Sequence, residues 1–490
     1  MKKLFLAAIL FTGLSAFSQE VTNVDTLSAR LTRMDKFMNI LREFRLSVYM
    51  QPEYQLADTA GQKGVAAGNF PANVNNRFLI RRGRMKLGYE HYIKDAMGRD
   101  SLKVIEAAFQ FDATEKGFNA VKDFYGKIID PWTGWFGFQG GIFLRPFGME
   151  TPAPPAYWES PEFARVNQTI MNNECEEGAA IVIESPKSFQ RKYNLDIRAD
   201  AGMFNGFGVG SSDPISGAVV TSTYQSRKDF IGRLQATKLI PYGANDNVMR
   251  IIVGTSLYQG NVLQTNSKVY NVETNSAGEL YFNKIAADTL GTNKNYFQRQ
   301  YAGAHAEFRI TYGKKDGKVG GSTMLRGEYI GGKEPGLTST SSPVISAVDT
   351  NIHLRHFNSA IVYVTQTIKH KRGGKTSSSN VDPYIYHDFT MKFDVYNPNT
   401  QVAQTAMTSA LGFSGADVLY RTIGLGYTFR PYNWFKLMVW YDIVTNAKTG
   451  ITGYTTDLKD NVLTIRTQFM FDTKFLGNDN NPNKLGLVGY

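Results

Sequence analysis

Apolar and polar side chains alternate along most of this chain. In the stretch RRGRMKLGYEHY at 81–92, Arg82 and Arg84 lie on one face of an extended strand and Met85 and Leu87 lie on the other. A soluble sheet buries its apolar face, whereas a transmembrane barrel turns that face to lipid and its polar face to an aqueous lumen. One strand fits both arrangements. The number of strands with this pattern and the lengths of the connections between them distinguish a soluble sheet from a membrane barrel.

The alternation recurs about sixteen times, and an even number of strands is typical of bacterial single-chain barrels. The first strand, for example, is expected to point Met50 outward and Gln51 inward. The sequence predicts strands near 44–51, 81–92, 105–112, 123–128, 134–145, 177–185, 193–203, 227–237, 247–258, 298–311, 320–330, 354–369, 385–397, 419–430, 434–445 and 461–471.

The connections between these strands alternate in length. Joins after even-numbered strands are mostly short, such as 130–133, and joins after odd-numbered strands are mostly long, such as 52–76 and 259–297. The short second outside loop and the long turn at 371–383 depart from this rule. Short turns at one end and long loops at the other are typical of outer-membrane barrels. We therefore predict an all-β protein, a transmembrane antiparallel β-barrel over 44–471 in the cell outer membrane.

The N-terminal segment has the features of an export signal. Lys2 and Lys3 precede an apolar run at 4–14 and the small-residue site Ala16-Phe17-Ser18. This order predicts a signal peptide at 1–18.

A helical period follows at 19–43, where apolar residues repeat with alternating spacings of four and three. The segment is expected to form either a short periplasmic coiled coil that helps a trimer assemble, or an amphipathic helix on or inside its own barrel. At the other end, 472–490 is rich in turn-forming residues and is expected to be a periplasmic tail. The residues with the helical period are Leu27, Leu31, Met34, Met38 and Leu41.

The net charge and the single cysteine limit the classes of function that this chain could have. The formal net charge is +11, and loss of Lys2 and Lys3 with the signal peptide leaves an excess of nine positive charges. A basic exported barrel suits an anion channel or a surface that faces lipopolysaccharide and other outer-membrane lipid. The charge is scattered along strands, which argues against a nucleic-acid partner. The single cysteine, Cys175, excludes an internal disulfide and is expected to be a loop thiol.

The sequence carries no pattern of enzymatic chemistry that we could identify. It has no G-x-S-x-G motif, and Gly374-Lys375-Thr376 fails as a phosphate-binding loop because Lys369 occupies the first glycine position. The six histidines show no spacing typical of metal ligands. We therefore expect no catalytic residues, no metal site and no cofactor.

The lumen-facing residues are the candidates for function. Arg82, Arg84 and Lys86 follow one another on the inward face without an acid before Glu90. Arginine suits phosphate or carboxylate because its planar fork binds two oxygens. The alternative to an anion-binding ladder is that inward-facing acids and bases neutralise one another across neighbouring strands. Further inward candidates are Asp112, Lys127 and Arg145.

The long third loop at 146–176 adds charge that could face this basic wall. It carries Glu159, Glu162 and Arg165. Acids on the loop and bases on the wall would set a transverse field across a constriction. The alternative is an external lid.

Several segments, in order, resemble the phosphate-selective porin O and P family in its Bacteroidetes-like branch. They are RRGRMKLGYE (81–90), AFQFDATEKG (108–117), VKDFYGKIIDP (121–131), FGFQGGIFLRPFGME (136–150), ESPEFARVNQTI (159–170), RTIGLGYTFRPYN (421–433) and LTIRTQF (463–469).

The resemblance implies a homotrimer of 16-stranded barrels, each with its own pore narrowed by the third loop. It also implies that Arg82, Arg84 and Lys86 belong to a basic ladder, Asp112 is a pore carboxylate and Arg145 closes the fifth strand. Members of the family conduct phosphate or pyrophosphate. The expected function is passive diffusion of small hydrophilic solutes through an anion-leaning channel. A general diffusion porin and a plugged structural or adhesive barrel are the alternatives.

Overall fold

A computed structural model describes most of the chain. The described residues are 30–34, 37, 41, 43–62, 64–65, 68–94, 100–114, 117–171, 174–206, 226–243, 247–264, 269–289, 295–313, 319–336, 352–373 and 383–473. The predicted signal peptide at 1–18 and nearly all of the predicted tail lie outside them. The chain divides into the units Met1–Phe44 and Arg45–Tyr490. In the first unit, 30–34, 37 and 41 are helical.

Sixteen strands of the described chain close into an antiparallel barrel, which confirms the predicted fold class. Each strand pairs with its neighbour in sequence, and the first and last close the ring through pairs such as Val48 with Phe471. The strands are β1 (Phe44–Ala57), β2 (Asn76–Lys94), β3 (Asp100–Thr114), β4 (Gly117–Ile129), β5 (Phe136–Leu144), β6 (Cys175–Glu184), β7 (Leu195–Phe204), β8 (Asp229–Tyr242), β9 (Asn247–Gln264), β13 (Asn295–Gly313), β14 (Val319–Gly336), β15 (Ile352–Lys371), β16 (Tyr384–Asn397), β17 (Tyr420–Tyr432), β18 (Phe435–Asn446) and β19 (Val462–Asp472).

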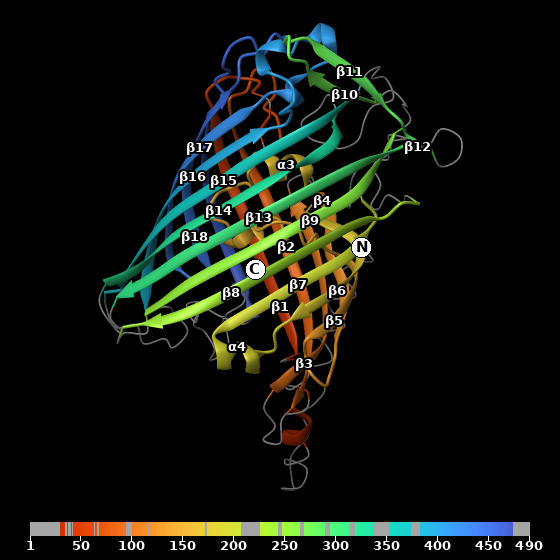
Figure 1. Cartoon of the computed structure of the whole chain (residues 1–490). Helices are drawn as coiled ribbons and strands as arrows, with labels where there is room; N and C mark the ends of the chain where they lie inside the picture. Colours follow the sequence, from red (N-terminus) through yellow and green to blue (C-terminus); the bar gives the residue numbers. More distant parts are fainter. Residues whose placement is uncertain are drawn as a thin grey trace, which may run out of the picture. The chain divides into compact units, whose positions relative to one another are not determined.

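Three short strands stand outside the ring, in the segment that the sequence predicts as one long loop. β10 (Val269–Thr274) and β11 (Leu280–Ile285) form a hairpin, and β12 (Asp288–Thr289) pairs with the start of β13. β10 also pairs in parallel with the first residues of β15. The hairpin lies at the end of the barrel opposite the helix α4 (Lys187–Tyr193), which fills one of the short connections (Figure 1). Apolar and polar residues do not alternate strictly in β10 and β11, so the pattern that predicts the wall strands does not reveal them.

The outer face of the barrel is apolar. Phe124 and Ile128 on β4 are 61% and 62% exposed, as their outward assignment requires. Met50 is likewise exposed while its neighbour Gln51 is fully buried. In a closed ring every backbone group of the wall pairs with a neighbouring strand, so an apolar exterior can face hydrocarbon. This is an outer-membrane barrel, as the sequence predicts.

Helices play little part in the described structure. Among the residues it covers, no helix is both long and apolar enough to cross a membrane.

Candidate functional site

The third loop, residues 145–174 between β5 and β6, folds into the barrel. Its two ends meet where the Arg145 amide donates to the Glu174 carbonyl at 2.9 Å. Within it lie the short 3₁₀ helix η1 (Pro155–Tyr157) and the helix α3 (Arg165–Ile170). Figure 1 shows α3 enclosed by the strands.

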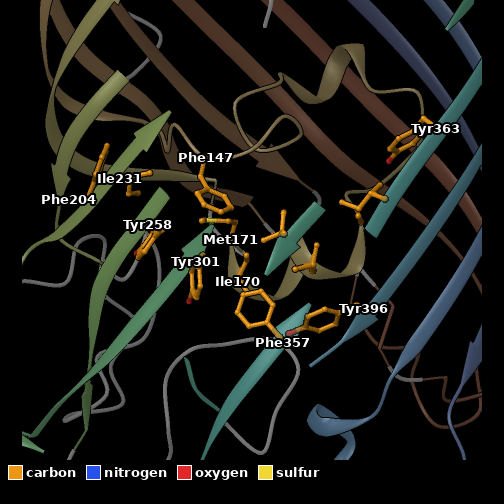
Figure 2. Packing of buried hydrophobic residues seen from close by; sticks show 14 of the residues in the cluster. Phe147, Ile170, Met171, Phe204, Ile231, Tyr258, Tyr301, Phe357, Tyr363 and Tyr396 are labelled. Carbon is orange, nitrogen blue, oxygen red and sulfur yellow. The ribbon is translucent and has the colours of Figure 1, made fainter. Parts of the chain in front are cut away.

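One side of the loop is held by a hydrophobic cluster. Phe147, Ile170 and Met171 of the loop are buried against inward-facing aromatic side chains of the wall. The Phe147 ring lies 6.3 Å from that of Tyr258 and 6.2 Å from that of Tyr301, both edge-on. Figure 2 shows these side chains pointing toward one another from the loop and from the wall. This hydrophobic cluster therefore lies inside the barrel, between the third loop and the wall.

Buried hydrogen bonds fix the same part of the loop. Glu150 accepts from the Ala164 amide at 2.9 Å, from Asn167 Nδ2 at 2.8 Å and from the Tyr363 hydroxyl at 2.6 Å. The Met149 amide donates to Glu328 Oε1 on β14 at 2.8 Å. A carboxylate that accepts three hydrogen bonds satisfies groups that would otherwise be buried without partners.

The loop also reaches the opposite wall. Lys436 Nζ on β18 and Gln468 Nε2 on β19 both donate to the Ala156 carbonyl, at 3.2 and 3.1 Å. Gln51 Nε2 on β1 donates to the Pro155 carbonyl at 3.3 Å. The loop therefore spans the interior, and the external-lid alternative is wrong.

Glu162 is the centre of one cluster of charges between loop and wall. It lies 2.7 Å from Arg81, 2.9 Å from Arg82 and 3.2 Å from Arg466. Burial alone would raise the pKa of Glu162, but the charges of these three arginines outweigh burial and hold the pKa well below its usual range. Arg466 also pairs with Glu53. The Glu162 cluster, Arg81, Arg82, Arg466, Glu162 and Glu53, thus holds three arginines and two carboxylates.

Glu159 is the centre of a second cluster, on the other side of the barrel. It pairs with Arg326 and lies 3.9 Å from Arg309. Glu307 accepts from Arg309 Nε at 3.2 Å and from Arg250 Nε at 3.1 Å. The Glu159 cluster, Arg250, Arg309, Arg326, Glu159 and Glu307, again holds three arginines and two carboxylates.

The residues predicted to form a basic ladder each face a carboxylate. Arg84 pairs with Asp112 at 3.1 Å and also with Glu174. The remaining pairs are Lys86 with Asp123 at 2.6 Å, Lys127 with Glu184 at 3.1 Å and Arg145 with Glu176 at 3.7 Å. The acids come from the next strand, from the next strand but one and from the third loop. The interval without an acid before Glu90 therefore exists along the sequence and not in space. Among the described residues, these predicted basic side chains are therefore neutralised by carboxylates from other parts of the barrel.

Two further predicted residues lie elsewhere. The guanidinium of Arg165 lies over the Tyr420 ring, 3.9 Å from its centroid, apart from both glutamate clusters. Cys175 is the first residue of β6 and is buried, so its assignment to a loop is wrong.

Sequence reasoning missed two members of the Glu162 cluster. Arg81 shares the odd-numbered parity of the outward-facing Met85, yet it reaches inward to Glu162. Glu53 lies beyond the predicted end of the first strand at 51, whereas β1 continues to Ala57. No signal in the sequence marks Arg81, but Gln51, Glu53 and Gln55 extend the inward alternation and would have revealed Glu53.

Neither a protein-family model nor a curated protein sequence matches this chain, whereas solved structures do. A structure of OprB from Pseudomonas putida is 11% identical, with a TM-score of 0.46 over 90% of this chain and 97% of that one. The outer-membrane channel DcaP of Acinetobacter baumannii is 10% identical, with a TM-score of 0.42 over 87% and 97%. An anion-selective porin from Comamonas acidovorans is 11% identical, with a TM-score of 0.39 over 87% and 98%.

The chain's own architecture defines its class. A closed barrel with an apolar exterior and a charged interior is an outer-membrane β-barrel protein. The finer resemblance to the phosphate-selective porin family stays a prediction.

Proposed function

We propose that this protein is a porin, a passive channel for small hydrophilic solutes whose lumen favours anions. The observation that carries the proposal is the excess of arginine where the third loop meets the wall. The Glu162 cluster and the Glu159 cluster each hold three arginines and two carboxylates. With both carboxylates ionised, each cluster retains one positive charge.

Water-accessible charge inside the barrel supports the same proposal. The inward-facing side chains of Lys86 and Arg198 remain 39% and 35% exposed although their strands form the wall. Solvent therefore reaches part of the interior. Within a low-dielectric wall, fixed charges are screened less than in bulk water and bias the passage of ions.

Planar-bilayer recording in a potassium chloride gradient tests the proposal. The wild-type reversal potential should report chloride over potassium. Arg326→Gln and Arg466→Gln each remove one positive charge from a cluster and should move the reversal potential toward cations. Arg421→Gln removes the same charge from an exposed position on β17 and serves as the matched control. A cation-selective wild type would contradict the proposal.

Phosphate is the proposed solute class within this function, because arginine binds two oxygens of one oxyanion at once. Millimolar phosphate should reduce the chloride current if the arginines of the two clusters bind it. An anion-selective pore whose current is indifferent to phosphate would leave the channel in place and remove phosphate as its solute. The homotrimer that the family resemblance implies is tested separately, by the mass of the protein in detergent.

A plugged barrel is the second candidate, and the extent of the third loop favours it. The loop contacts β1, β18 and β19 on one side and β9, β14 and β15 on the other. Such a plug would serve a structural or adhesive role. Liposomes that contain the protein should swell in small sugars if it is a channel and should not swell if the loop seals the lumen.

A further inference from the structure

Two histidines lie side by side on the outer face of the barrel, at the end that carries the short turns. His370 is the last residue but one of β15, and His387 lies near the start of β16. The register pairs Ile368 with His387 and His370 with Ile385, so the histidines are diagonal neighbours across two strands. They share a face with Phe389, which is exposed on the exterior of the wall.

The two imidazole rings face each other through the same kind of nitrogen. His370 Nε2 and His387 Nε2 are 3.1 Å apart, and the ring planes differ by only 19°. The other nitrogens turn away from the pair. His387 Nδ1 lies 2.8 Å from the Tyr427 hydroxyl, and His370 Nδ1 lies 3.4 Å from the Lys371 carbonyl.

These partners allow an arrangement of protons in which both Nε2 atoms carry a lone pair. A carbonyl oxygen can only accept, so a hydrogen bond over the 3.4 Å contact with Lys371 requires the proton of His370 on Nδ1 and leaves a lone pair on Nε2. The Tyr427 hydroxyl can accept a hydrogen bond from His387 Nδ1 in the same way, which leaves a second lone pair on His387 Nε2. In this arrangement two lone pairs face each other at 3.1 Å, and a cation can lie between them; if Tyr427 instead donates to His387 Nδ1, the His387 Nε2–H donates to His370.

We propose that His370 and His387 form a two-histidine site for a divalent late transition-metal ion, with Tyr427 as the partner that orients His387. Metal–nitrogen distances of about 2.0–2.1 Å and the observed nitrogen separation give a nitrogen–metal–nitrogen angle of about 100°, which suits a four-coordinate ion. Hydrogen bonds from the distal Nδ1 atoms are the usual way in which proteins orient such ligands.

The surroundings define the remaining coordination. Phe429 packs against His387 and Phe389 packs against Tyr427, and the described part of the chain contains no group of three or more His, Cys, Asp and Glu side chains that could hold a metal. In the proposed site, water completes the coordination shell. Neutral imidazoles with water favour Cu²⁺ over Ni²⁺ and Zn²⁺. The histidines are seventeen positions apart in sequence, and only the strand register brings them together, so their spacing along the chain does not indicate a metal site.

Metal titration of the full-length protein in detergent, without a histidine tag, tests this site. Calorimetry with CuCl₂ should show one saturable site per chain, and the electron paramagnetic resonance spectrum of bound Cu²⁺ should show coupling to two imidazole nitrogens. His370→Asn and His387→Asn should each abolish the saturable site. His356→Asn removes a histidine from outside the pair and should leave it unchanged.

Either of two results would overturn the site. One is a wild-type spectrum without coupling to two imidazole nitrogens, which needs no variant. The other is unchanged stoichiometry and affinity in a folded His370→Asn or His387→Asn protein, with folding checked by the heat-dependent gel shift of barrels. The site is independent of conduction, so failure of the channel proposal would not affect it.

Discussion

Gly148 of the third loop lies directly against the carboxylate of Glu328 on β14. A Cβ built on Gly148 would come within 2.3 Å of Glu328 Oε1, and the glycine has a φ of +68°. The same oxygen accepts from the amide of the next residue, Met149, at 2.8 Å. The loop thus enters the lumen through a backbone contact that leaves no room for a side chain.

This contact predicts that Gly148→Ala loosens the base of the loop. The left-handed backbone alone costs a residue with a Cβ about 1–2 kcal/mol, and displacement of the Glu328 carboxylate adds to that cost. Gly243→Ala is the matched control, because Gly243 has a φ of +66° with no atom within 4 Å of its Cβ position. The temperature at which the barrel unfolds, measured by its heat-dependent shift on gels, should be lower for Gly148→Ala than for the control. Equal midpoints would show that the contact contributes nothing.

The hydrophobic cluster inside the barrel makes a second prediction. Phe147→Ala should destabilise the packing of the loop by about 3–5 kcal/mol, the usual cost of truncating a buried phenylalanine. Phe138→Ala is the control, since Phe138 faces outward and is 53% exposed. Limited proteolysis should cut the third loop in Phe147→Ala, where the loop is loosened, and should leave it intact in the wild type and in Phe138→Ala. If the loop of Phe147→Ala is protected as well as that of the wild type, the hydrogen bonds of Glu150 and Glu328 are enough to hold the loop in place.

The barrel could be predicted from the sequence because each strand carries its own signal. Alternation assigned Phe124 and Ile128 to the outside, and both are exposed. The alternating lengths of the connections supplied an independent argument for the same fold. These features are local, so one sequence suffices to show them.

The partners of the site residues could not be predicted in the same way. Lys86 meets Asp123 although β3 separates their strands, and Arg82 meets Glu162 across 80 positions. Such pairs depend on register and on how the loop folds, which periodicity does not determine. The position of the loop follows from the buried contacts of Phe147 with Tyr258 and Tyr301, and alternation along a strand does not reveal which wall side chains a loop will contact.

The turn after β4 predicts a pH dependence of stability. Asp130 accepts hydrogen bonds from the hydroxyl and amide of Thr133 and from the amides of Phe136 and Trp132, and these hold its pKa below the usual range. Its stabilising effect is therefore complete above the unfolded pKa of about 3.9 and is lost as the pH falls toward the folded value.

Asp130→Asn should accordingly be less stable than the wild type at pH 7. The gap between their unfolding temperatures should narrow once the pH falls below about 4. A gap that stays constant from pH 7 to pH 3 would show that the charge of Asp130 is not responsible.

Glu162→Gln tests whether the Glu162 cluster lies on the path of the ions. The low pKa of Glu162 keeps its carboxylate ionised at neutral pH, so the substitution raises the net charge of the cluster from one positive charge to two. Chloride selectivity should increase, and the protein should lose stability because three arginines lose their shared acceptor.

Glu273→Gln, on the exposed side of the β10 hairpin, makes the same charge change outside the lumen and should alter neither property. A Glu162 variant with lower stability and an unchanged reversal potential would assign the cluster to structure alone and move the ion path elsewhere in the barrel.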